Sequence, residues 1–268
     1  MAIITVSRGS YSKGKEVAEK VGKKLGYECI SRDVLLEASE WFNIPEVKLV
    51  RAIHDAPSVL GRFAYGKEKY VSFIEAAILR HFKKDNVVYC GLAGHFFVRG
   101  VSHVLKVRIM ADFEDRVRLE MEREGISEKE AAHILKKDDE ERRKWSMHLY
   151  GIDTWDPSLY DLVIHIKKIS ADAAVDMICN TVALEEFKTT PESQKMIENL
   201  ALAAEVRAAI IHMKPDVLVS ASDGKVTLKT SEIGSKEIAL EKELKEAALA
   251  VPGVREVEVA VRPKDIAP

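Results

Sequence analysis

The chain of 268 residues has only three cysteines, no excess of either charge and no long apolar run. Cys29, Cys90 and Cys179 lie far apart, which fits neither a disulfide framework nor a Cys-x-x-Cys metal clip and so predicts a reducing compartment. The 41 basic and 43 acidic side chains nearly cancel, so the chain as a whole lacks the positive charge that drives binding to nucleic acid. No nucleic-acid partner is therefore expected.

Membrane-spanning and zinc-binding patterns are also missing. No stretch approaches 18 uninterrupted apolar residues, and the apolar run at 3–6 is too short for the core of a signal peptide, which predicts a cytoplasmic protein. The eight histidines show neither H-x-x-x-H nor H-E-x-x-H spacing, and G-x-S-x-G is absent. Neither a zinc site nor a serine hydrolase is indicated.

The first two thirds of the chain alternate between short β-branched runs and longer segments with helical spacing. Strands separated by helices predict crossover units and a parallel sheet, with ligands at the carboxyl ends of the strands. Ser127, followed by Glu128 and Glu130, is a candidate N-cap of one of the helices. The expected strands lie at 3–6, 87–91, 105–111 and 160–166.

The last third has a different organisation. Residues 185–194 lose the apolar periodicity and contain Pro191, which predicts a linker. A helix, two alternating strands, a second helix and a last strand follow, and Asp223-Gly224 between the two alternating strands favours a type I′ hairpin because this turn needs positive φ. The predicted division is a first domain at 1–186, a linker at 187–194 and a small α+β domain of order α-β-β-α-β at 195–268.

Residues 9–16 carry the first candidate site, because they lie between a predicted strand and a predicted helix. Seven of their eight positions conform to the pattern G-x-x-x-x-G-K-[ST], in which glycine permits close backbone approach and lysine contacts phosphates. Backbone N–H groups and the positive end of the helix can then converge on phosphate oxygens. A turn that binds nothing is the alternative. The candidate nucleotide-binding residues are Gly9, Ser10, Tyr11, Ser12, Lys13, Gly14, Lys15 and Glu16.

Glu16 stands where the pattern has the hydroxyl that binds magnesium. A carboxylate can contact Mg²⁺ directly or through water, which makes Glu16 the candidate metal ligand. Alternatively, Glu16 faces away from the loop and its charge stabilises the helix N-terminus. Lys13 either adds a second cation to the loop or is an exposed residue at its tip. The sequence leaves both pairs of alternatives open.

A basic run at 136–145 carries the second candidate site. Arg142, Arg143 and Lys144 could close over transferring phosphates and neutralise their charge, since phosphoryl transfer needs positioning and electrostatics more than covalent chemistry. The alternative is a solvated helix face, in which Asp138 pairs with Arg142 and Asp139 with Arg143. Either interpretation places these residues on a helix.

Four further polar residues lie at the expected ligand edge of the sheet. Arg116 and Arg118 follow the third predicted strand at the start of a helix, and surface solubility is the alternative explanation for both. Arg32 and Asp33 lie where a second strand would end. They could meet the phosphate and a polar group of an acceptor, or could equally be surface residues.

Several stretches together resemble the cytidylate kinase-like family, a branch of the P-loop nucleoside monophosphate kinases. The family's loop commonly has the form S-R-x-x-G-S-G-G-R-E, so a glutamate at position 16 is shared with it. The resemblance covers about residues 1–184. It rests on ITVSRGSYSKGKEVAEKVGKKLGYECISRD, VVYCGLAG, EREGISEKEAAHILKKDDEERRKW and YGIDTWDPSLYDLVIHI.

This resemblance implies an α/β fold of the P-loop NTPase type, a parallel sheet flanked by helices with a helical lid. It implies ATP and Mg²⁺ as cofactors and phosphoryl transfer to a small nucleotide, expected to be a pyrimidine nucleoside monophosphate of the CMP or dCMP kind. Asp139 and Arg142 match the family's D-x-x-R in the lid. The implied catalytic residues are Lys15, Arg142 and Arg143, and the implied substrate contacts are Arg32, Asp33, Arg116 and Asp139.

The sequence departs from the family pattern at two places. Gly91-Leu92-Ala93 stands where the family has a Gly-Arg pair, so an arginine near the acceptor phosphate is missing. The last strand ends in His165-Ile166, where the family usually has Asn-Thr. A nucleotide-binding sensor that has lost efficient turnover is therefore the alternative to a kinase.

Residues 195–264 resemble a BON domain, most clearly in VLVSASDGKVTLKTSEIGSKE and VPGVREVEVAV. Relatives of this domain often occur in envelope or membrane-associated proteins, where lipid or ligand binding has been proposed. The balanced charge and the missing apolar anchor argue against lipid binding here. A regulatory or partner-binding role is the preferred expectation, and a homo-oligomer stays open.

Overall fold

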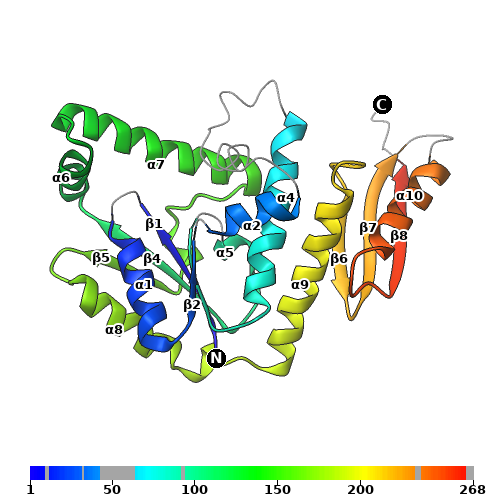
Figure 1. The fold of residues 1–268 in the computed structure, drawn as a ribbon, viewed down its shortest axis with the longest axis horizontal. Coiled ribbons are helices and arrows are strands. Elements are labelled where there is room, and N and C mark those ends of the chain that lie inside the picture. The colour runs from blue at the N-terminus through cyan, green and yellow to red at the C-terminus, as the bar shows by residue number, and fades with distance from the viewer. Residues whose placement is uncertain (10–11, 32, 43–63, 92–93, 233–236, 264–268) are drawn as a thin grey trace.

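The computed structural model describes the chain apart from residues 10–11, 32, 43–63, 92–93, 233–236 and 264–268. Two sheets organise it, and both appear in Figure 1. The larger one has five parallel strands in the order β2-β3-β1-β4-β5. Their bounds are β1 (Ile3–Arg8), β2 (Glu28–Ile30), β3 (Val87–Cys90), β4 (Val104–Ala111) and β5 (Leu162–Ile166).

The central strand β1 is buried on both faces, which explains why it forms a continuous apolar run. Side chains alternate across a strand, so Ile3 enters one core while Ile4 and Val6 enter the other. Strands β2 and β3 lie on one side of β1, and the later strands β4 and β5 lie on the other, so the order of strands reverses at β1. Ligands of open α/β sheets bind at such a switch point, outside the carboxyl ends of the strands.

Helices cover both faces of the larger sheet, which confirms the predicted α/β architecture (Figure 1). One core joins the sheet to α1 (Gly14–Leu25) and α8 (Ala171–Val182). The opposite core holds residues of α4 (Ala64–Phe82), α5 (Gly94–Phe97) and α9 (Pro191–Ile210). A further helix, α2 (Asp33–Trp41), packs on α4. Short 3₁₀ turns lie at Pro157–Leu159 and Glu185–Phe187.

A hairpin of two helices, α6 (Phe113–Glu124) and α7 (Glu128–Tyr150), extends from the sheet at the side where β1 ends (Figure 1). It has a small core of its own that includes Val117 and Leu135. Ser127 caps α7, as predicted: its Oγ accepts a hydrogen bond from the Glu130 N–H, and the Glu130 carboxylate accepts one from the Ser127 N–H. The reciprocal bonds fix where the second helix begins.

The smaller sheet belongs to what we call the C-terminal unit, formed by β6 (Leu218–Ser222), β7 (Lys225–Glu232), α10 (Glu237–Leu249) and β8 (Glu256–Pro263). Strands β6 and β7 are antiparallel, and β8 runs parallel to β7. Asp223 and Gly224, which connect β6 to β7, have φ values of 50° and 79°. The predicted Asp-Gly hairpin is therefore confirmed, and its positive φ angles are those that a type I′ turn requires.

Helix α9 lies between the larger sheet and the C-terminal unit, and it contributes to both cores (Figure 1). One stripe of the helix faces α4, and three of its residues are alanines, which let the two helices approach closely. The other stripe faces β6 and α10. The first stripe consists of Ile197, Ala201, Ala204 and Ala208, and the second of Leu202, Val206, Ala209 and Ile210.

The structure differs here from the linker expected at 187–194. Pro191 occupies the first turn of α9, where its missing N–H costs nothing, and the Thr190 side chain caps the helix by accepting from the Ser193 N–H. The last four residues of that stretch are therefore helical. The sequence signal was misleading because proline at a helix start resembles proline in a loop.

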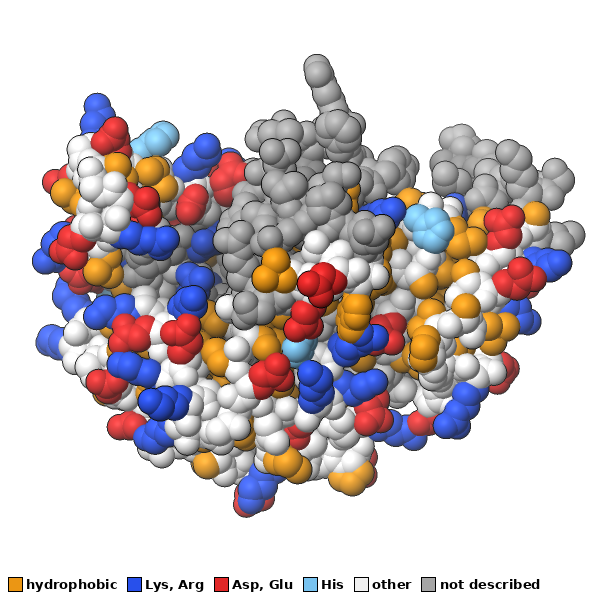
Figure 2. Space-filling model, viewed as in Figure 1, with side chains coloured by type: hydrophobic (Ala, Val, Ile, Leu, Met, Phe, Trp, Pro, Cys, Tyr) orange, Lys and Arg blue, Asp and Glu red, His pale blue; other side chains and the backbone are white. Residues whose placement is uncertain are grey.

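The face of the molecule in Figure 2 carries basic and acidic side chains interspersed with one another, in keeping with the nearly balanced composition. Within the described part of the chain, none of the helices is both long and apolar enough to cross a membrane.

The double packing of α9 makes a prediction about stability. Ile197 and Ile210 are both fully buried but face different cores, so truncating either to alanine should lower the free energy of unfolding by about 2–5 kcal/mol. Met196 is 43% exposed, and Met196→Ala should change it by less than about 0.5 kcal/mol. Urea titration of the three variants measures these differences. An unchanged free energy of unfolding in Ile197→Ala would contradict the packing of α9 into the core that it shares with α4.

Candidate active site

The loop between β1 and α1 has the geometry of a phosphate cradle. Lys13 adopts the left-handed conformation, with φ 62° and ψ 9°, and no side chain caps α1. A Cβ added to Gly14 would lie 2.7 Å from the Arg8 Cβ, so only glycine fits there. Ser12 is buried, and its Oγ donates to the Gly9 carbonyl over 3.1 Å. The Lys13 side chain does not cap the first N–H groups of α1, and an anion site at a helix N-terminus uses such N–H groups.

A cleft of about 280 Å³ opens beside this loop. It brings together Lys13, Gly14 and Lys15 from the predicted loop and Arg142 from the predicted lid, which are more than a hundred residues apart in sequence. Ser10 and Tyr11, also predicted here, lie outside the described residues. The complete lining is Arg8, Ser12, Lys13, Gly14, Lys15, Arg123, Asp138 and Arg142.

Arg8 is a residue of this cleft that the site prediction missed. It is the last residue of β1, and its Nε is buried without a hydrogen-bond partner. Burial first, and then the positive charge of Arg8, lower the pKa of the Arg142 guanidinium. The two side chains therefore place two cations near each other in a cleft that the Asp138 carboxylate also lines, and the charges of Asp138 and Asp139 oppose the fall in the Arg142 pKa. The available sequence signal was an arginine at the carboxyl end of an otherwise apolar strand.

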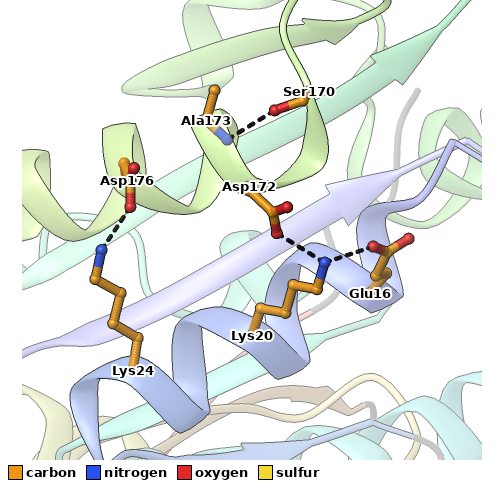
Figure 3. Close-up of polar contacts among 7 residues, drawn as sticks. All are labelled: Glu16, Lys20, Lys24, Ser170, Asp172, Ala173 and Asp176. Atoms are coloured by element: carbon orange, nitrogen blue, oxygen red, sulfur yellow. Dashed lines mark hydrogen bonds and ion pairs between the residues drawn. The ribbon is translucent and has the colours of Figure 1, made fainter.

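Lys15 and Glu16 diverge at the start of α1. The Lys15 ammonium lines the cleft and lies 3.6 Å from the Glu19 carboxylate in an exposed, weak ion pair. Figure 3 shows Glu16 turned toward Lys20, with Oε1 2.8 Å from Nζ, while the same Nζ lies 2.8 Å from Oδ1 of Asp172 on α8. Glu16 does not line the cleft, which favours the interpretation that it faces away from the loop.

The predicted magnesium ligand therefore does not fit a metal beside the cleft. The Glu16 carboxylate is held by the Lys20 ammonium, and the hydrogen bonds that Lys20 donates to Asp172 and Glu16 raise the pKa of Lys20. Among the residues that the structure describes, no three His, Cys, Asp or Glu side chains are grouped as a metal site. We accordingly assign no metal ligand among the residues that the structure describes.

Arg116 and Asp139, both predicted substrate contacts, bind each other. The Arg116 NH1 and NH2 groups lie 2.8 and 2.9 Å from the two Asp139 carboxylate oxygens, in a largely buried bidentate pair. The Arg116 guanidinium carbon also lies 3.3 Å from the position of a Cβ added to Gly9. Arg116 thus connects α6, α7 and the phosphate loop. The alternative pairing of Asp139 with Arg143 is not what the structure has.

Arg143, predicted to be catalytic, is directed elsewhere. It binds the Asp153 carboxylate through three contacts of 2.6 to 3.1 Å, and its guanidinium carbon lies 4.9 Å from the centroid of the Trp155 ring. The hydrogen bonds from Arg143 lower the pKa of Asp153. Of the two adjacent lid arginines, only Arg142 lines the cleft, because neighbouring residues of a helix point about 100° apart.

The predicted acceptor side is described only in part. Arg32 and Leu92 lie outside the described residues. Asp33 begins α2, immediately beyond the end of β2. At the other edge of the sheet, the Nε2 of His165 lies 2.8 Å from the Asp112 carboxylate, which also binds Lys167.

A second polar cluster, which the prediction also missed, lies beneath the end of β1. Arg108 of β4 donates to the Thr154 carbonyl over 2.7 Å and lies 3.1 Å from the Tyr160 hydroxyl, which in turn lies 3.3 Å from the Ser7 Oγ. The His95 ring lies 5.0 Å from that of Tyr160. Burial, followed by the charge of Arg108, lowers the pKa of His95 to about 3. The sequence signal was a lone arginine within an apolar strand.

A second cleft of about 280 Å³ adjoins the first, because Lys13 lines both. It lies between the phosphate loop, α6 and the end of β5. Leu119 and Ile166 give it apolar surface, and Arg118 and Lys167 give it positive charge. The remaining lining residues are Ala111, Asp115 and Glu122.

Comparison with known proteins agrees with this geometry. Residues 3–168 match the sequence profile of the cytidylate kinase-like family. A cytidylate kinase of Archaeoglobus fulgidus is 27% identical over 188 residues, which are 69% of this chain and 97% of that protein. A cytidylate kinase of Pyrococcus horikoshii is 30% identical over 181 residues, 66% of this chain and 85% of that protein.

One solved structure has the same fold. It is that of an uncharacterised protein from Eubacterium ventriosum, which superposes with a TM-score of 0.54 at 22% sequence identity. The match covers 68% of this chain and 98% of that protein. The family match ends at residue 168, before α9 begins.

The buried His95 predicts a dependence of stability on pH. Its folded pKa of about 3 lies below the unfolded value of 6.5, so the unfolded state binds a proton that the folded state does not. The free energy of unfolding should fall by about 1.4 kcal/mol for each pH unit below 6.5 from this residue alone. His95→Gln should remove that part of the slope in urea titrations between pH 5 and 7, whereas substituting the exposed His133 should not. Parallel slopes for parent and His95→Gln would contradict the burial of a neutral imidazole.

Proposed function

The chain belongs to the cytidylate kinase-like family, and from this premise we propose that it transfers the γ-phosphoryl group of ATP to a pyrimidine nucleoside monophosphate of the CMP or dCMP kind. The observation that carries the proposal is the cleft in which Arg8, Lys15 and Arg142 meet the N-terminus of α1. Five cationic residues and one carboxylate, Asp138, line this cleft beside a helix N-terminus, and this excess of cations suits the charge of a polyphosphate.

The phosphates of ATP are proposed to lie in this cleft, against the backbone of residues 9–16. The adjoining cleft would hold the rest of the donor nucleotide, because it offers Leu119 and Ile166 as apolar surface and opens directly beside Lys13. The glycines of the loop support this assignment: a side chain at Gly14 would collide with Arg8 and one at Gly9 would press on Arg116. Each substitution would displace an arginine beside the space proposed for the phosphates of ATP.

Lys15 and Arg142 are the proposed catalytic residues. Charge spreads over the oxygens of a phosphoryl group as it transfers, so fixed cations placed around it stabilise the transition state more than the ground state. The acceptor phosphate is already ionised at neutral pH and needs no general base. Magnesium is proposed to arrive bound to ATP, since Mg²⁺ commonly keeps waters and substrate phosphates as ligands. No step is assigned to a protein-bound ion.

Arg116 and Asp139 are proposed to position the lid, since each satisfies the other's charge within the described structure. Arg32 and Asp33 remain the proposed acceptor contacts, on the strength of the family resemblance and of the position of Asp33 at the start of α2. The proposed division of the chain is a kinase-like domain at 1–186 and a BON-like domain at 195–268. For the second domain we propose a regulatory or partner-binding role.

Replacing the loop lysine tests the proposed activity. Lys15→Ala should lower kcat/KM for acceptor-dependent ADP release by about 100-fold or more, because a cation directed at the transferring phosphoryl group is lost. The assay uses ATP, Mg²⁺ and a panel of nucleoside monophosphates, and thermal unfolding confirms that the variant is folded. Equal turnover of variant and parent would exclude the assignment. ATP binding without ADP release in the parent would instead identify a nucleotide sensor.

Two neighbouring lid arginines give a matched comparison. Arg142→Ala should lower kcat about 100-fold, because Arg142 lines the cleft. Arg143→Ala should change kcat less than about threefold, because its guanidinium binds Asp153 and the Trp155 ring. Steady-state kinetics at saturating ATP measure both values. Equal losses in the two variants would mean that the lid rearranges to bring Arg143 into the cleft as well.

A further inference from the structure

Arg80 of α4 contacts two helices at once. Its Nε lies 3.2 Å from Oε1 of Glu205 on α9, and its guanidinium carbon lies 3.0 Å from the centroid of the Trp41 ring at the end of α2. The ion pair is part-buried, with the Glu205 side chain only 18% exposed, so it is less weakened by solvent than a surface pair. A planar guanidinium suits both contacts, because it can stack on an aromatic ring while its edge donates to a carboxylate.

Further contacts attach α2 to α4. The Nε2 of His81 lies 2.7 Å from the Glu37 carboxylate, and the Phe42 and Phe73 rings stack with centroids 4.3 Å apart. Helix α2 therefore rests on α4 through a buried histidine and an aromatic stack as well as through Arg80.

Helix α4 in turn rests on α9. The alanine stripe of α9 brings the two helices close, and Arg207 of α9 lies 3.6 Å from the carboxylate of Glu75 on α4. Burial raises the pKa of Glu75, and the charge of Arg207 opposes that rise. The opposite stripe of α9 belongs to the core of the C-terminal unit. The side-chain contacts thus connect the C-terminal unit to α2 through α9 and α4, and Figure 1 shows α9 between α4 and that unit.

The start of α2 lies at the ligand edge of the sheet. Asp33 is its first residue and follows the end of β2, whereas the cleft assigned to ATP lies at the end of β1. Closely packed elements move as units, so a shift of α9 would be passed to α4 and α2. None of the described residues that line the donor cleft belongs to α2, α4 or α9, so this cleft should be affected much less.

We propose that Arg80 is a positioning residue through which α9 and the C-terminal unit set the placement of α2, and with it the affinity for the acceptor nucleotide. This inference rests on the kinase activity proposed above. It gives the C-terminal unit a defined effect on the reaction: the KM for the acceptor depends on it, and the KM for ATP does not.

Charge reversal on α9 tests the inference in the full-length chain. Glu205→Lys places a second cation against Arg80 and should raise the KM for the acceptor about 5- to 10-fold, with kcat and the KM for ATP changing less than twofold. Glu198→Lys is the matched control: it makes the same charge change on the same helix, but Glu198 is exposed, and the contact described for it is with Gln194. The control should leave all three parameters unchanged.

A double-mutant cycle tests whether Arg80 is the link. Trp41→Leu removes the other contact of Arg80 and should also raise the KM for the acceptor. Combined with Glu205→Lys, it should raise that KM by less than the product of the single effects, because both changes act through the same side chain. Multiplicative effects, an unchanged acceptor KM in Glu205→Lys, or equal rises in both KM values would overturn the inference while parental turnover is intact. Absence of turnover in the parent would overturn the proposed function and this inference together.

Discussion

The burial of β1 on both faces is the constraint on which the rest of the structure depends. Ile3 points into one core and Ile4 and Val6 into the other, so a slip by one residue would move each of these side chains into the core packed around the other set. Its register against β3 and β4 is fixed in the same way. The end of β1 is therefore a rigid point from which the chain turns into α1. The position of this strand end determines where Arg8 and the loop before α1 lie.

The site built at this point gathers several cationic side chains around one cleft, which the Asp138 carboxylate also lines. Arg142 comes from a helix whose start is fixed by the Ser127 capping box and whose placement over the loop is fixed by the Arg116–Asp139 pair. Burial, and then repulsion from Arg8, lower the pKa of the Arg142 guanidinium, whereas the Asp138 and Asp139 carboxylates oppose that change. Binding of a polyphosphate would convert that repulsion into attraction. The fold keeps these cations close together despite their mutual repulsion, and an anionic ligand would reduce that repulsion.

Helix α9 shows how a second constraint joins the two sheets. A helix with one apolar stripe can belong to one core, whereas two stripes interleaved along α9 serve two cores at once. The sequence predicted this helix as part of a separate small domain behind a linker. The helix begins at Pro191 and packs against α4 as well, and two features of the sequence did not indicate this: proline also occurs in loops, and a stripe rich in alanine carries little apolar signal.

The sequence by itself determined the parallel α/β order, the glycine-containing turn between β1 and α1, the Ser127 cap and the Asp223-Gly224 hairpin. Each of these depends on neighbouring residues, through strand periodicity, glycine geometry, capping or turn chemistry. Only the tertiary structure decided which charges meet. It directed Arg142 into the cleft and Arg143 to Asp153, paired Arg116 with Asp139, turned Glu16 to Lys20 and brought in Arg8. Long charged side chains reach several partners, and the packing of the helices that carry them selects one.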